Sequence, residues 1–135
     1  MGFKVHLIDA DVQPSLSKYY GISHEAANGL HKVVRDGVIT RNEISEITIP
    51  EMLLPDGSRP VLDLIYSDSV DGSIQTWLST QGDRVMRLKF PIHQSPYMRE
   101  EGQYDVVIID SPGAVSALQD AAVVAAGMLI SPVVR

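Results

Sequence analysis

The 135-residue chain contains no cysteine. Disulfides, thiolate nucleophiles and cysteine-ligated zinc sites are therefore excluded. The 17 acidic side chains outnumber the 11 basic ones, and the formal net charge of -6 argues against the chain itself being a general nucleic-acid binder. The longest uncharged stretch, residues 121–134, is shorter than the roughly 20 residues that span a bilayer. The first residues lack the pattern of a secretory signal, so we expect a cytoplasmic protein that does not bind membranes.

Short apolar runs alternate with helical patterns along the chain. The 44% apolar content is that of a globular protein, and the length fits one domain over residues 1–135. We expect strands over residues 4–8, 61–65, 106–109 and 128–134. Helical segments are expected over residues 15–20, 29–35, 73–80, 84–90 and 116–126, and a polar surface loop over residues 91–102. This alternation predicts an α/β fold, a parallel sheet covered by helices.

The segment after residue 40 carries a helix-start signal. Thr40 and Glu43 have the spacing of a capping box, in which each side chain serves a backbone amide at the start of a helix. Ile44 and Ile47 would then pack a short helix that ends at Pro50.

Two of the expected strands end in aspartate. Asp9 and Asp11 follow the first apolar run, and Asp110 follows the run over residues 106–109. Ligands of open α/β sheets bind outside the carboxyl ends of the strands. Carboxylates gathered there repel one another unless a cation or a proton lies between them, and magnesium with a phosphate ligand satisfies such a cluster. The pattern therefore favours phosphate chemistry, although either aspartate of the first pair could instead cap the turn that follows it.

Two blocks resemble a known family. KVHLIDADVQPSLSKYY, residues 4–20, is similar to the second-strand signature of ParA/MinD-type partition ATPases, which has a D-x-D-P-Q core. QYDVVIIDSPGAVSALQDAAVVAAGMLISPV, residues 103–133, resembles the Walker B strand of that family with the helix and strand after it. The resemblance implies a three-layer P-loop fold, a parallel sheet with helices on both faces, of which this chain is an incomplete part.

The resemblance assigns roles to five residues. Asp110 matches the Walker B carboxylate that holds magnesium through its water shell, and Asp9 lies beside it near the metal. Asp11 matches the catalytic aspartate that positions or activates the attacking water, while Gln13 and Ser111 fall at nucleotide-binding positions together with Asp9. The chain departs from the family pattern in the loop after the first aspartate pair and after the Walker B aspartate, at Val12, Pro14 and Gly113.

The sequence has no glycine-rich loop ending in lysine and threonine, the Walker A loop that cradles phosphates in this family. In the family, that loop and its strand precede the strand over residues 4–8, and further elements follow residue 135. We therefore expect the chain to be the middle of an ATPase domain and, alone, to bind neither ATP nor magnesium appreciably. The absent strand would lie next to the Walker B strand, and the unpaired edge predicts self-association or domain swapping.

Three functions follow from these observations. The resemblance implies an ATP-dependent dimer switch that binds DNA nonspecifically on the bacterial nucleoid, meets a centromere-binding ParB-like partner, and segregates plasmid, chromosome or integrated DNA. A second interpretation is a haloacid-dehalogenase-like phosphatase, with Asp9 as nucleophile and Asp11 as acid/base. A third is a ParA-like module that binds a partner without catalysis.

Overall fold

The computed structural model describes residues 4–11, 21–68, 71–101, 103–111 and 116–130. Its strands are β1 (Val5–Asp9), β2 (Ser45–Thr48), β3 (Val61–Ile65) and β4 (Val106–Asp110). Its helices are α2 (Leu30–Asp36), α3 (Ser73–Ser79), α4 (Lys89–Gln94), α5 (Pro96–Arg99) and α6 (Ala117–Ala125), with 3-10 turns η1 (Arg41–Glu43) and η2 (Arg84–Met86). In these parts no helix is long and apolar enough to cross a membrane.

The four strands form one sheet in the order β2-β3-β1-β4. β1 runs parallel to both β3 and β4, as the alternation of strands and helices predicts. β2 pairs antiparallel with β3, so the sheet is mixed and the expectation of an all-parallel sheet is wrong at this strand. Among the described strands β4 pairs with β1 alone, which leaves its other edge open.

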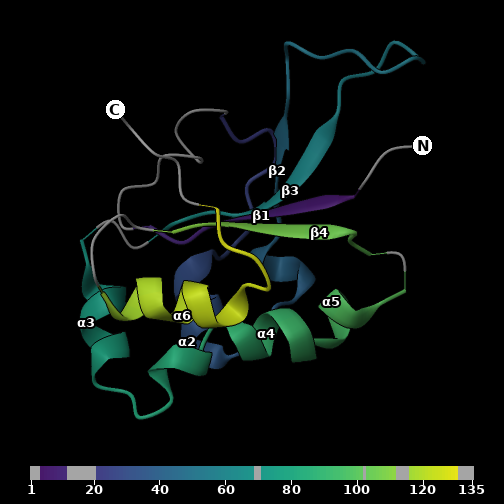
Figure 1. Ribbon diagram of the computed structural model, residues 1–135. Coiled ribbons are helices and arrows are strands. Elements are labelled where there is room, and N and C mark those ends of the chain that lie inside the picture. Colours follow the sequence, from purple (N-terminus) through teal and green to yellow (C-terminus); the bar gives the residue numbers. More distant parts are fainter. Residues whose placement is uncertain (1–3, 12–20, 69–70, 102, 112–115, 131–135) are drawn as a thin grey trace, which may run out of the picture.

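Alternation along β1 and β3 divides the apolar side chains between two faces of the sheet. Ile8 and Ile65 are register partners and pack into the larger core, while Leu7 and Leu64 form a smaller cluster on the opposite face. Successive side chains of a strand point to opposite faces, which accounts for the division. Figure 1 shows the helices gathered against one face of the sheet.

The larger core joins this helix layer to the sheet. Leu30, Val33 and Val34 give α2 its buried face, and Gly37 ends the helix in a left-handed conformation with φ of 72°. The other buried apolar members come from the residue after β1, from the remaining helices and from the loops between them: Ala10, Ile39, Ile44, Ile74, Leu78, Leu88, Ile92, Leu118, Ala121, Ala122 and Ala125. The arrangement confirms an incomplete α/β fold.

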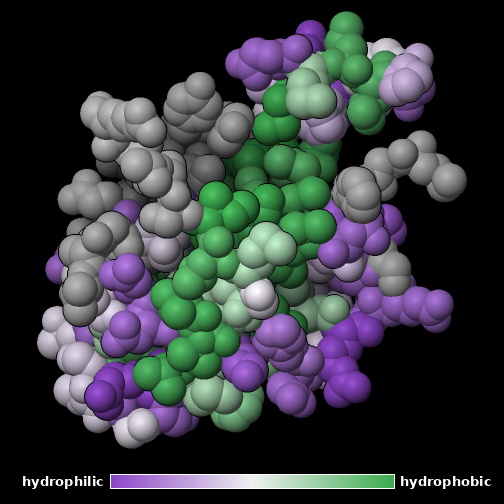
Figure 2. Space-filling view, in the orientation of Figure 1, coloured by the Kyte–Doolittle hydropathy of each residue, from purple (hydrophilic) through white to green (hydrophobic). Residues whose placement is uncertain are grey.

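The opposite face of the sheet is open at β4. The apolar side chains of Val106 and Ile108 on β4 are 42% and 49% exposed. Met128, Leu129 and Ile130, which follow α6, are more exposed still. Figure 2 shows a continuous apolar band on the side of the molecule that carries β4 and α6.

The helix expected after Thr40 is wrong beyond its first turn. The capping box is confirmed, because Thr40 Oγ1 accepts from the Asn42 amide at 3.2 Å and Glu43 Oε1 accepts from the Thr40 amide at 3.1 Å. It caps only η1, and the chain then extends into β2. Within β2 buried and half-buried residues alternate with a period of two, as in a strand packed on one face. Pairing with β3 therefore overrides the local helix signal.

The loop expected over residues 91–102 is also wrong, because α4 and α5 occupy much of it. Pro91 and Pro96 lie in the first turns of these helices, where proline breaks no internal hydrogen bond. The helical stretch expected over residues 84–90 is divided between η2 and the start of α4. Residues 128–130 are not in a strand, while residues 15–20 and 131–134 lie outside the described residues.

Candidate active site at the carboxyl edge of the sheet

Asp9 and Asp110 end neighbouring parallel strands. They are register partners in the pairing of β1 with β4, and the amide of Ala10 donates to the carbonyl oxygen of Asp110 at 2.9 Å. Register partners on adjacent strands point to the same face of a sheet, so both carboxyl groups leave the same face. The predicted convergence of these two residues is thus present in the backbone geometry.

Burial and charge act together on these groups. The side chain of Asp9 is fully buried, and those of Asp11 and Asp110 are half-buried. Burial raises the pKa of the Asp110 carboxyl, and the negative charge of Asp11 raises it further. Asp11 is therefore near enough to Asp110 for their charges to repel, which is the condition that a bound cation relieves.

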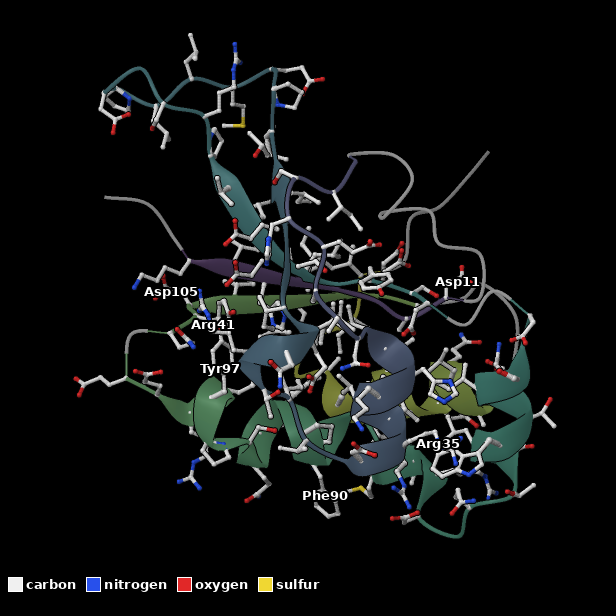
Figure 3. All side chains as sticks on the ribbon, turned by 180° about the vertical axis from the view of Figure 1, so that it is seen from behind. Asp11, Arg35, Arg41, Phe90, Tyr97 and Asp105 are labelled. Atoms are coloured by element: carbon white, nitrogen blue, oxygen red, sulfur yellow. The ribbon has the colours of Figure 1, made fainter. Side chains whose placement is uncertain are left out.

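Residues after β3 hold the neighbouring loops in place. The hydroxyl of the buried Ser67 donates to the carbonyl oxygen of Asp11 and ties the turn after β1 to the end of β3. Three strand ends thus meet at this edge. Figure 3 shows Asp11 at this end of the molecule, away from Arg41 and Asp105.

Asp68 caps the start of α2. Its Oδ2 accepts from the Gly29 amide at 3.1 Å and its Oδ1 accepts from the His31 amide at 2.9 Å. The amide of Leu30 donates to the carbonyl oxygen of Tyr66 at 2.9 Å. Asp68 is not predicted from the sequence, because a cap supplied from 39 residues away leaves no local signal.

The two remaining predicted site residues are Ser111 and Gln13. Ser111 is exposed directly after β4, at the same edge as Asp110. Gln13 falls in a segment that the structure does not describe.

The donors at this edge suit magnesium completed by phosphate. Magnesium is bound by one or two carboxylates plus substrate phosphates rather than by an all-protein cage. The described residues contain no group of three or more histidine, aspartate or glutamate side chains that could hold a metal by themselves. Asp110 and Asp9 therefore fit such an ion as partial ligands.

Comparison with known proteins decides the family. A model of the AAA domain family matches residues 1–135, the whole chain. The chain belongs to this family of ParA/MinD-type P-loop ATPases. A comparison with curated protein sequences finds no match.

Solved structures of this fold include two proteins that bind ATP or its analogue. Apo McdA from Cyanothece has 27% sequence identity and a TM-score of 0.67, covering 93% of this chain and 44% of that protein. An McdA variant in complex with ATP has 26% identity and a TM-score of 0.67, covering 93% and 43% of the two chains. Cobyrinic acid a,c-diamide synthase from Mycobacterium smegmatis, with an ATP analogue and magnesium, has 22% identity and a TM-score of 0.66, covering 93% and 45%.

This ParA/MinD-type chain spans less than half the length of the solved proteins it matches. The family assignment leaves the phosphatase interpretation without support.

Proposed function

We propose that the protein containing this chain is an ATP-dependent switch that segregates DNA, and that this chain supplies its hydrolytic carboxylates. The observation that carries the proposal is the meeting of Asp9, Asp11 and Asp110 at one edge of the sheet, with Asp11 close enough to raise the pKa of Asp110. In the hydrolysis of a γ-phosphate, the protein positions the reacting groups and neutralises charge, and it forms no covalent bond to the substrate.

Each carboxylate has a separate task in this proposal. Asp11 accepts a hydrogen bond from the attacking water and orients it, since its backbone is fixed by Ser67. Asp110, with Asp9 beside it, would hold the waters around Mg²⁺. The family resemblance assigns Gln13 and Ser111 to nucleotide binding. Magnesium, when bound, supplies the positive charge that neutralises the phosphate oxygens.

The proposal extends to partners and location. ATP would favour a dimer of two copies that binds DNA nonspecifically on the bacterial nucleoid in the cytoplasm, and a centromere-binding ParB-like protein would stimulate hydrolysis. Membership of the ParA/MinD-type family supports these assignments, and the DNA element is a plasmid, a chromosome or an integrated element.

ATP hydrolysis by the full gene product that contains this chain tests the proposal. We expect slow Mg²⁺-dependent hydrolysis that DNA and the partner increase, with Asp11→Ala abolishing hydrolysis while nucleotide binding persists. Glu101→Gln, an exposed change away from this edge, is the matched control and should keep the wild-type rate. Hydrolysis that survives Asp11→Ala would contradict the assignment of the water-positioning residue.

The isolated 135-residue chain provides a second measurement. It has no Walker A loop in its sequence, so we expect calorimetry to detect no appreciable Mg²⁺-ATP binding. Turnover of a simple phosphate ester by this chain, lost in Asp9→Asn, would instead establish the phosphatase alternative. A gene product without any Walker A loop would establish the non-catalytic module.

Plasmid retention in dividing cells tests the DNA cargo. Loss of a plasmid bearing the gene and its neighbouring centromere should rise to the random rate in Asp11→Ala. Equal retention in both strains would contradict a role in DNA segregation.

A further inference from the structure

A row of ionisable side chains crosses the sheet away from the carboxyl edge. His6 on β1 is the register partner of Asp63 on β3, and Asp63 is the partner of Glu46 on β2. An isolated antiparallel bridge continues the row from Glu46 to His24. Cross-strand partners share a face, so all four side chains leave the sheet on the side where the helices lie. The proposed ATPase mechanism uses none of them.

Two tyrosines cover one end of the row. The ring of Tyr104 stacks on that of His6 with centroids 4.6 Å apart, and its hydroxyl donates to Asp63 Oδ2 at 2.6 Å. The hydroxyl of Tyr97 lies 3.2 Å from that of Tyr104. Figure 3 places Tyr97 and Arg41 together at the end of the molecule opposite Asp11. The Asp63 carboxylate is therefore held in place from one side.

The other side of Asp63 faces a cavity of about 270 Å³. Its lining is Asp63 and Glu46 from the sheet, Arg41 from η1, and His24 and Ile44 from the adjoining loops. Arg41 makes no ion pair with either carboxylate, so charges of opposite sign line one cavity without neutralising each other. Opposite charges held apart in this way are complementary to a ligand that carries both signs.

The lining excludes simpler ligands. A metal ion is not favoured, because the described residues hold no metal-binding group of histidine and carboxylate side chains. An inorganic anion would meet Asp63 and Glu46, and a plain cation would meet the guanidinium of Arg41. Pockets for drug-sized ligands are roughly 300 to 1,000 Å³, so this cavity suits a smaller molecule.

We infer that this cavity binds a free α-amino acid, with its carboxylate on Arg41 and its ammonium group between Glu46 and Asp63. Arg41 is exposed and presents a planar fork of donors that matches a carboxylate. Ile44, which is buried, gives the side chain of the ligand an apolar wall. The site is separate from the carboxyl edge, so a test of amino-acid binding is independent of the proposed ATPase function.

His6 and Tyr104 keep Asp63 available as an acceptor. Burial lowers the pKa of His6 to about 4, so its ring is neutral near pH 7 and does not compete for the carboxylate. Burial and the hydrogen bond to Asp63 raise the pKa of Tyr104, so its hydroxyl keeps its proton and donates. Asp63 retains a further oxygen for an ammonium group.

Calorimetric titration of the 135-residue chain with L-alanine and L-leucine tests the inference. Ethylamine and propionate serve as probes that carry only one of the two charges. We expect both amino acids to bind at millimolar concentration or tighter and each single-charge probe to bind at least about tenfold more weakly.

Paired variants locate the site. Arg41→Gln and Glu46→Gln should each weaken amino-acid binding by about tenfold or more, because each removes one charged contact. Arg99→Gln and Glu101→Gln remove the same charges from exposed positions outside the cavity and should leave the affinity unchanged. Circular dichroism of each variant serves as the check that it folds like the wild-type chain. Equal binding of ethylamine and L-alanine, undiminished binding in Arg41→Gln, or no amino-acid binding at millimolar concentration would each overturn the inference.

Discussion

Asp9 and Asp110 lie opposite each other at the ends of β1 and β4, in a register fixed by the hydrogen bond from the Ala10 amide to the Asp110 carbonyl oxygen. Two chain segments about a hundred residues apart in sequence thus place their carboxylates on one face. The charge gathered there is unfavourable without a cation. The folded chain therefore carries a destabilising group at its candidate active site.

Asp110→Asn should stabilise the chain at neutral pH. The Asp110 carboxyl has a pKa above its ordinary value of 3.8 because of burial first and Asp11 second. The folded state therefore holds this proton more tightly than the unfolded chain, and stability falls as the pH rises from 3.8 through the raised pKa. We expect the variant to lose this dependence and to gain less than about 1 kcal/mol at pH 7, because solvent screens a half-buried charge.

Urea denaturation at several pH values measures the effect. Glu101→Gln is the control, since it removes one negative charge from an exposed position. A pH dependence that is the same in Asp110→Asn and in the wild-type chain would show that folding does not raise the pKa of Asp110, either through burial or through Asp11.

Gly29→Ala should destabilise the fold at the start of α2. A Cβ atom at this position would lie 2.4 Å from the carbonyl oxygen of Tyr66, which accepts the Leu30 amide at 2.9 Å. The backbone must move to admit it, so we expect a loss of about 2 kcal/mol or more in unfolding free energy. Gly82→Ala is the matched control, because nothing lies within 4 Å of a Cβ there, and its effect should stay within about 0.5 kcal/mol.

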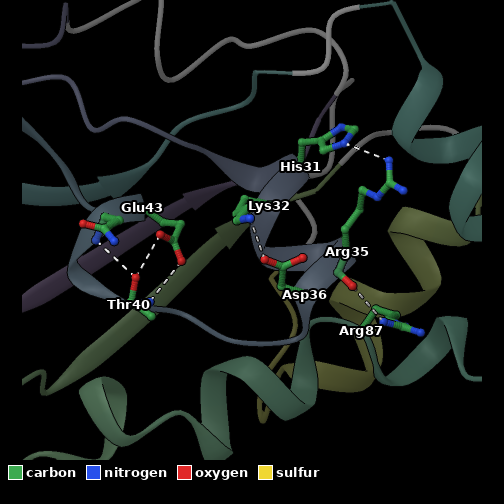
Figure 4. A network of polar contacts seen from close by, with 8 residues as sticks. His31, Lys32, Arg35, Asp36, Thr40, Glu43 and Arg87 are labelled. Carbon is green, nitrogen blue, oxygen red and sulfur yellow. Dashed lines mark hydrogen bonds and ion pairs between the residues drawn. The ribbon is translucent and has the colours of Figure 1, made fainter.

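The carboxylate edge and the helix cap at residue 40 could be predicted because their signals are local. A short β-branched run ending in aspartate predicts both a strand and a polar group at its end. Thr40 and Glu43 form their capping box within a single turn, as Figure 4 shows. Interactions within a few residues depend little on what surrounds them.

The features missed by sequence reasoning depend on distant partners. Residues 45–48 become a strand because β3 offers a pairing edge, and Asp68 caps a helix that begins more than thirty residues earlier. The row from His6 to His24 exists only through the register of three strands and a bridge. Register is set by the whole sheet, and no single segment encodes it.

Arg87→Gln should destabilise the helix layer more than Arg84→Gln, although Arg84 begins η2 and Arg87 directly follows it. The guanidinium carbons of Arg35 and Arg87 each lie 5.2 Å from the centre of the Trp77 ring. Arg87 also pairs with Asp83 at 3.0 Å and donates to the carbonyl oxygen of Arg35 at 3.2 Å, the second contact being drawn in Figure 4. We expect a loss of about 1 kcal/mol for Arg87→Gln and less than about 0.5 kcal/mol for Arg84→Gln.

The single tryptophan of the chain reports this contact directly. Its emission should shift to longer wavelength in Arg87→Gln, because the ring becomes more exposed to water, and stay unchanged in Arg84→Gln. Identical spectra and denaturation midpoints in the two variants would show that the guanidinium of Arg87 does not stabilise the ring.

His6→Leu should make the free energy of unfolding less dependent on pH in the acid range. Burial lowers the pKa of His6 from 6.5 to about 4, so between these values the unfolded chain binds a proton that the folded chain does not. Stability conferred by the neutral ring is therefore full above pH 6.5 and is lost as the pH falls toward 4, by roughly 3 kcal/mol in total. Leucine has no such titration, so the variant should show a flatter dependence over this range.

At pH 7 the leucine variant should be at least as stable as the wild-type chain. Neither ring nitrogen of His6 has a hydrogen-bond partner among the residues that the structure describes. Replacing such a buried polar ring by an apolar side chain removes a desolvation penalty. Chemical denaturation from pH 4 to 8 measures both effects, with His93→Gln as the control at an exposed position. If His6→Leu and the wild-type chain lose the same unfolding free energy on acidification, protonation of the His6 ring does not cause that loss.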